Sequence, residues 1–222
     1  MRADKHLSPT CCCWAPERLL ASGDGRFAAP VTVSLRGRLI VAAPTLKDPN
    51  FDRTVVFVLE HTDDGALGVV LNRPSEIEVS DALPGWGLLA TQPPVVFLGG
   101  PVAPTGAICL GRTDVTGDGG AESGEEGGGW MPLFGGLGTV DLDASPDDVA
   151  PKVVDLRVFV GHAGWGGGQL DGEVDVGGWF VLDAIPDDAF SPRPESLWEM
   201  VLRRQGGAMA RVANFPSDPG MN

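Results

Sequence analysis

The chain has 222 residues, of which 43% are hydrophobic, and this is enough to bury the core of one domain or of one domain with an appended lobe. Its 30 acidic and 16 basic residues give a formal net charge of −14, and no cluster of lysine and arginine suits a phosphate backbone. No apolar run reaches the ~18 residues of a membrane-spanning helix, and no apolar signal-peptide segment follows the first residues. We therefore expect no nucleic acid or membrane partner, and a cytoplasmic location.

The four cysteines predict neither disulfides nor a metal site. Cys11, Cys12 and Cys13 are adjacent, so they lack the separated pairs and partner histidines of a zinc site, and Cys109 stands alone in an apolar stretch. His61, His162 and Glu173 could supply three ligands, but their spacing does not match a metal motif. We expect no metal and no cofactor.

Composition divides the chain into one domain and three flexible segments. Residues 1–30 mix proline, glycine, serine and charge without periodicity, which predicts a flexible N-terminal extension. Residues 31–205 are expected to form a single domain. Within it, residues 113–129 are acidic and glycine-rich, as expected of a flexible surface loop. Residues 206–222 are expected to be a flexible C-terminal tail.

The first half of the domain is predicted to contain mostly strands. Short apolar runs predict strands over residues 39–44, 54–61 and 66–71, and Thr62–Gly65 is a hairpin signal between the last two. The continuous hydrophobicity of residues 54–61 predicts burial on both faces of that strand. Next, a short helix is predicted over 77–83, with Ser75 as N-cap and Glu78 at capping-box spacing. Further strands are predicted over 95–98 and 107–110.

The second half mixes strands with helices. Ser145-Pro146-Asp147-Asp148 has the order of a helix start, and this helix is predicted to reach Val153. Apolar spacing and arginines in the last turn predict a final helix over 194–205. Further strands are expected over 137–142, 156–160 and 178–183, and a turn of helix over 185–190. This mixture predicts a mixed α/β (α+β) fold with a layered β-sheet flanked by short helices.

A glycine-rich stretch follows the strand over 156–160. Glycine occupies six of the twelve positions from Gly161 to Gly172, and His162, Trp165 and Gln169 lie among these glycines. Glycine allows positive φ angles and close approach by another chain or a ligand. A simple connecting loop would not need those three side chains, so the stretch is predicted to form a binding surface.

Four segments, in this order, resemble the YqgE/AlgH family of bacterial proteins. They are residues 37–74, VVFLGGPV over 95–102, LRVFVGHAGWGGGQLDGE over 156–173, and Trp179, so the resemblance covers roughly 35–205. It implies a β-sheet or partial barrel flanked by helices, with these segments meeting at one cleft, in a cytosolic protein. One member was named as a regulator of alginate production. The segment GAICLGR, 106–112, lacks the histidine that many relatives carry near its end.

The resemblance implies that these four segments assemble a ligand-binding cleft here. The residues expected to line it are Glu60, Asn72, Arg73, Gly99, Gly100, Gly164, Trp165, Gln169 and Glu173, and the candidates for catalysis are His61, His162 and Glu173. Structural alternatives remain open. His61 could be a hydrogen-bonded structural histidine, Trp179 could pack in the core, and Arg73 could pair with Glu60 or Asp171.

Three functions are compatible with these residues. The first is a non-enzymatic regulatory or binding protein for a small molecule or protein partner. The second is an enzyme, such as a hydrolase, that uses His61 or His162 with Glu173 as acid–base pair. The third is a DNA-binding regulator, which the absence of a basic helix-turn-helix pattern disfavours. The sequence has no G-x-S-x-G nucleophile, and Gly164–Gly168 lacks the lysine of a phosphate loop, so the first is preferred.

Overall fold

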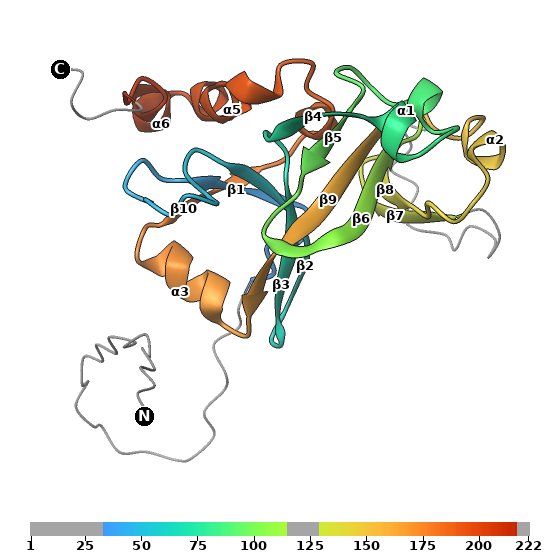
Figure 1. The fold of residues 1–222 in the computed structure, drawn as a ribbon. Helices are drawn as coiled ribbons and strands as arrows, with labels where there is room; N and C mark the ends of the chain where they lie inside the picture. The colour runs from blue at the N-terminus through green and yellow to red at the C-terminus, as the bar shows by residue number, and fades with distance from the viewer. Residues whose placement is uncertain (1–32, 115–128, 217–222) are drawn as a thin grey trace, which may run out of the picture. The chain divides into compact units, whose positions relative to one another are not determined.

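The computed structural model describes residues 33–114 and 129–216, which form a mixed α+β fold around a ten-stranded, curled sheet (Figure 1). The expected extension over 1–30, Cys11–Cys13 and nearly all of the acidic loop lie outside the described residues. The strands are β1 (Arg38–Ala42), β2 (Val55–Thr62), β3 (Gly65–Val70), β4 (Pro74–Glu78), β5 (Val95–Leu98), β6 (Val102–Arg112), β7 (Trp130–Phe134), β8 (Leu137–Val140), β9 (Asp155–Gly166) and β10 (Trp179–Asp183). The helices are α1 (Val79–Ala82), η1 (Gly87–Leu89), α2 (Pro146–Val149), α3 (Gln169–Asp175), α4 (Pro186–Ala189), η2 (Pro194–Ser196), α5 (Leu197–Gln205) and α6 (Gly207–Val212).

Strand β9 is the centre of the sheet. The main order is β10-β1-β2-β3-β9-β6-β8-β7, and β5 pairs with both β4 and β9. The first part of β9 pairs antiparallel with β6, its last four residues pair antiparallel with β3, and Phe159 pairs parallel with Phe97 of β5. The sheet curls enough for Phe57 of β2 to contact Phe134 of β7, with ring centroids 5.7 Å apart.

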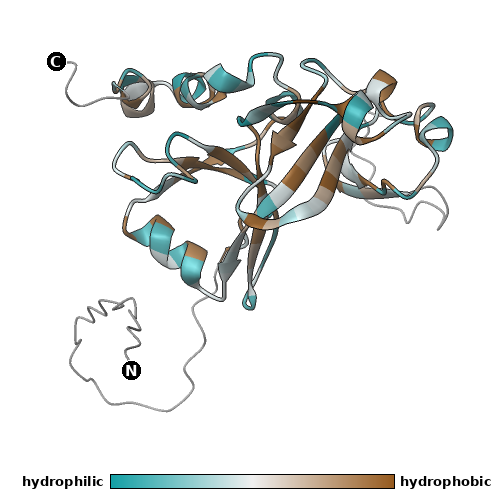
Figure 2. Ribbon diagram, viewed as in Figure 1, coloured by the Kyte–Doolittle hydropathy of each residue, from teal (hydrophilic) through white to brown (hydrophobic). Residues whose placement is uncertain are grey.

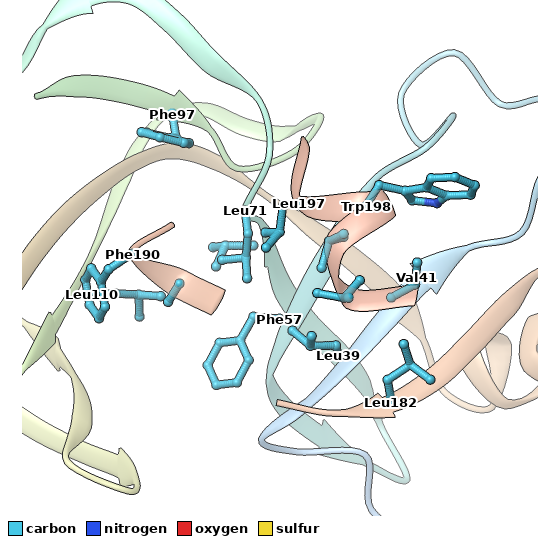
Figure 3. Close-up of a cluster of buried hydrophobic side chains, with 14 of the residues drawn as sticks. Leu39, Val41, Phe57, Leu71, Phe97, Leu110, Leu182, Phe190, Leu197 and Trp198 are labelled. Atoms are coloured by element: carbon cyan, nitrogen blue, oxygen red, sulfur yellow. The ribbon is translucent and has the colours of Figure 1, made fainter. Parts of the chain in front are cut away.

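Both faces of the sheet are buried around β1 and β2. Leu39, Val41 and Phe57 pack with buried residues of α5, whereas Ile40 and Val56 pack on the opposite face, in the cluster that holds Leu170 of α3. Figure 3 shows residues of the first cluster, with Leu197 and Trp198 of α5 among them, and Figure 2 shows hydrophobic residues concentrated on the strands. The predicted burial of the strand over 54–61 on both faces is confirmed.

The predicted start of the helix over 77–83 is wrong. Residues Pro74–Glu78 pair with β5 as strand β4, so α1 begins only at Val79. Ser75 does not cap it, because its hydroxyl accepts the N–H of Ile77 within β4. The helix predicted to end at Val153 is also shorter and ends at Val149.

Helix α3, strand β7 and helix α6 were not predicted. The glycine-rich stretch is not a loop: β9 extends into it as far as Gly166, and α3 begins at Gln169 after a two-residue turn. Glycines weaken both helix and strand signals, which explains why these elements were missed. Strand β7 contains Pro132 and adjoins the acidic loop. Helix α6 lies in the expected flexible tail, where Met209 and Val212 pack against the core.

None of the helices in residues 33–114 and 129–216 has the length and apolar character needed to span a membrane.

Candidate functional site

The carboxylate of Glu173 is the centre of a hydrogen-bond cluster that joins α3 to the sheet. Its Oε2 accepts the indole N–H groups of Trp165 at 3.0 Å and of Trp179 at 2.8 Å, and its Oε1 accepts the side-chain amide of Gln169 at 2.9 Å. The carbonyl oxygen of Gln169 in turn accepts the N–H of Gly166. Three of the predicted site residues therefore do meet, and their polar groups bind one another.

Phe51 completes this cluster. Its ring stacks on Trp165 with centroids 5.9 Å apart and meets Trp179 edge-on at 5.5 Å. Trp165 and Trp179 are 7% and 3% exposed, so the aromatic rings fill the space between α3 and the sheet. Phe51 was not among the predicted site residues, although a single aromatic residue in the polar stretch Lys47–Asp52 is a signal of such packing.

His61 lies under the same helix and is 8% exposed. Its Nδ1 accepts the N–H of Leu35 at 3.0 Å, so the ring carries a proton on Nε2, which lies 3.4 Å from Oδ2 of Asp171. Both ring nitrogens thus hold neighbouring segments in place. Asp171 was considered only as a partner of Arg73, and that pairing is wrong.

Asn72 and Arg73 fix the segment before β2. Asn72 accepts the N–H of Val55 at 2.8 Å and donates to the carbonyl of Arg53 at 2.9 Å. Arg73 donates to the carbonyl oxygen of Asp52 at 3.0 Å. The alternative salt bridge with Glu60 does not form. Both side chains therefore take backbone partners next to Phe51.

Gly99 and Gly100 lie against the backbone of β9. A Cβ at Gly99 would lie 2.4 Å from the carbonyl oxygen of Gly161, and one at Gly100 would lie 2.3 Å from that of His162. Gly100 also has a φ of 151°, which side chains rarely adopt. Gly99 and Gly100, which were expected to line a ligand cleft, thus lie in close contact with another segment of this chain.

The remaining candidates share an open face of the sheet. The register aligns Glu60 with Leu67, and Leu67 with Gly164, so the three lie side by side across β2, β3 and β9. His162 precedes Gly164 by two residues and therefore lies on the same face. Glu60 and Gly164 are exposed, while Leu67 and His162 are partly buried. We refer to Glu60, Leu67, His162 and Gly164 as the β2–β3–β9 face.

The predicted residues thus form separate groups: the Glu173 cluster, the pair Asn72 and Arg73, the Gly99–Gly100 turn against β9, and the β2–β3–β9 face. No three His, Cys, Asp or Glu side chains within 33–114 and 129–216 are placed to hold a metal ion. Cys109 is 2% exposed, and burial raises the pKa of its thiol to about 12, so it is a poor nucleophile.

A family model described as AlgH-like matches residues 39–210. The chain belongs to the AlgH-like family. This confirms the resemblance found in the sequence. Among curated relatives, the UPF0301 protein SCO2948 of Streptomyces coelicolor is 51% identical over 190 residues, which cover 85% of this chain and 96% of the relative. A UPF0301 protein of Thermobifida fusca is 48% identical over 199 residues, covering 86% and 96%.

Two solved structures resemble this AlgH-like chain. The crystal structure of protein DIP2367 from Corynebacterium diphtheriae has a TM-score of 0.74 and 32% identity, covering 81% of this chain and 92% of that one. The solution structure of AlgH from Pseudomonas aeruginosa has a TM-score of 0.58 and 24% identity, covering 86% and 98%, and it supports the fold alone. These similarities confirm the predicted fold class and place the chain in an uncharacterised bacterial family.

Proposed function

We propose that this AlgH-like protein is a non-enzymatic binding protein that takes a small-molecule ligand on the β2–β3–β9 face. The observation that carries the proposal is the contrast between the candidate residues. His61, Gln169 and Glu173 use their polar atoms within the chain, whereas Glu60 and His162 lie on an accessible surface beside Gly164.

The chemistry of this face suits recognition. Glu60 supplies hydrogen-bond acceptors, His162 supplies both a donor and an acceptor, and the partly buried Leu67 between them supplies apolar contact. Gly164 has no side chain, so a ligand can approach the β9 backbone closely. The predicted roles of Glu60 and Gly164 in ligand binding are kept in this proposal.

The enzyme alternative has less support. A general base must be able to take a proton in the resting site, but Nδ1 of His61 already accepts an N–H and both carboxylate oxygens of Glu173 accept hydrogen bonds. Neither group could act without breaking a contact that holds α3 or residues 34–35 in place.

A thermal-shift screen of the full chain against cytosolic metabolites tests the proposal. A ligand at one hundred times its Kd adds roughly 2.7 kcal/mol of stability. We expect at least one compound to stabilise the wild type, with the shift lost in Glu60→Gln and His162→Gln. Glu76→Gln, an exposed glutamate on β4, is the control and should keep the shift. Stabilisation that persists in both test variants, or no stabilisation by any metabolite, would contradict the proposal.

A further inference from the structure

A cavity of about 250 Å³ lies between residues 34–37 and the β7–β8 hairpin, where the curled sheet brings β7 close to β2. It contains none of the residues of the β2–β3–β9 face. Its lining residues are Ser34, Arg36, Gly37, Phe57, Val58, Leu133 and Phe134. The mouth of a curled or barrel-like sheet is a common place for ligand sites.

The lining is mostly apolar with one cation. Phe57 is buried at the base of the cavity, and the partly buried Leu133 and Phe134 form a wall; the Phe57 and Phe134 rings contact one another, with their planes tilted by 36°. Arg36 is exposed, and within the described residues its guanidinium forms no ion pair or hydrogen bond. A guanidinium beside aromatic walls recognises a carboxylate attached to an apolar or aromatic body.

The wall formed by residues 34–37 is fixed to β2. Gly37 donates its N–H to the carbonyl of Val58 at 2.8 Å, and the Ser34 hydroxyl donates to the carbonyl of His61 at 3.0 Å. The Leu35 N–H is held by the His61 ring. Gly37 has a φ of 76°, and a Cβ there would lie 3.6 Å from the Phe134 ring, in the gap between the two walls. The cavity is therefore preformed, which lowers the entropy cost of binding.

We propose that this cavity binds a small monocarboxylate with an aromatic or branched apolar body, its carboxylate on Arg36 and its body against Leu133 and Phe134. A volume of about 250 Å³ equals that of about eight water molecules in the liquid. This suits an acid the size of 3-phenylpropionate.

The test is an NMR titration of the full chain with 3-phenylpropionate and with 3-phenylpropionamide, its neutral analogue. We expect the acid to shift the amide signals of Gly37 and Phe134 and to bind roughly tenfold more tightly than the amide. Arg36→Gln should remove this preference and leave binding of the amide unchanged. Arg211→Gln, which removes an exposed arginine on α6, should change nothing.

Two further variants separate this site from the other proposal. Phe134→Ala should weaken binding of both compounds, whereas His162→Gln should affect neither, even if the β2–β3–β9 face has no ligand. The proposal is overturned if neither compound shifts Gly37 or Phe134 at millimolar concentration. Equal affinity for acid and amide in the wild type would also overturn it, since Arg36 would then have no role.

Discussion

Trp179 donates its indole N–H to Oε2 of Glu173 at 2.8 Å, and this bond ties β10 to α3. The same oxygen also holds Trp165 of β9, so a single carboxylate oxygen satisfies two almost fully buried N–H groups. Hydrogen bonds to a charged acceptor are stronger than neutral ones, and buried donors without a partner are costly. Glu173 is therefore expected to stabilise the fold, whatever else it does.

Replacing Glu173 with alanine should lower the free energy of unfolding by about 2–4 kcal/mol, because two buried indole donors lose their acceptor. Glu173→Gln should cost less, since an amide oxygen can still accept both indoles. Urea unfolding followed by tryptophan fluorescence measures both changes. Asp175→Ala removes the same charge from an exposed position of α3 and should leave stability nearly unchanged. A loss equal to that control would show that the cluster does not stabilise the protein.

Arg157 is a second residue whose contacts predict a large effect. The residue is 1% exposed, and its guanidinium donates to the carbonyls of Gln92, Ala189 and Ser191 and lies 4.3 Å from the centre of the Phe97 ring. Burial lowers its pKa to about 10, so the group stays charged at neutral pH.

Arg157→Lys should destabilise the protein by about 2–3 kcal/mol, because an ammonium cannot reach all three carbonyls in the planar geometry of guanidinium. Chemical denaturation at neutral pH provides the measurement. Arg193→Lys, at an exposed position, is the matched control. If the two variants were equally stable, the carbonyl contacts of Arg157 would contribute nothing to the fold.

The strands were the predictable part of the fold. Residues 54–61 and 66–71 have continuous apolar runs joined by a tight turn, and these local signals are sufficient to place β2 and β3. Helix α3 was not predictable in the same way. Its first residue follows three glycines, and the contacts that stabilise it, from Glu173 to Trp179 and from Asp171 to His61, join residues that only the tertiary fold brings together.

The candidate site was predicted less completely. The sequence grouped Trp165, Gln169 and Glu173 correctly, because they lie within one short segment. It could not show that Gln169 and Trp165 would donate hydrogen bonds to the Glu173 carboxylate. The cavity beside Arg36 was not predicted at all, since its walls come from residues about 100 positions apart that meet through the curl of the sheet.

Two glycine substitutions should have opposite effects. Gly172 lies within α3, and a Cβ there meets nothing within 4 Å, so Gly172→Ala should stabilise the protein by about 0.5–1 kcal/mol through its higher helix propensity. Gly100→Ala should cost about 3 kcal/mol or more, because the new Cβ clashes with the His162 carbonyl at a positive φ. Thermal and urea unfolding measure both. A destabilised Gly172→Ala would mean that α3 needs flexibility at this position.

The buried thiol of Cys109 predicts a loss of stability in alkali. Its pKa is raised from 9.0 to about 12 by burial, so between these values the unfolded chain loses a proton that the folded chain keeps. The stabilising contribution is fully present below pH 9 and declines as the pH rises towards 12. By about pH 10.5 it should have fallen by about 2 kcal/mol. Cys109→Ala has no thiol, so its stability should decline less between pH 8 and about 10.5, whatever its starting value. Urea unfolding at both pH values gives the difference, and parallel declines in the two proteins would show that the Cys109 thiol ionises equally in the folded and unfolded chains.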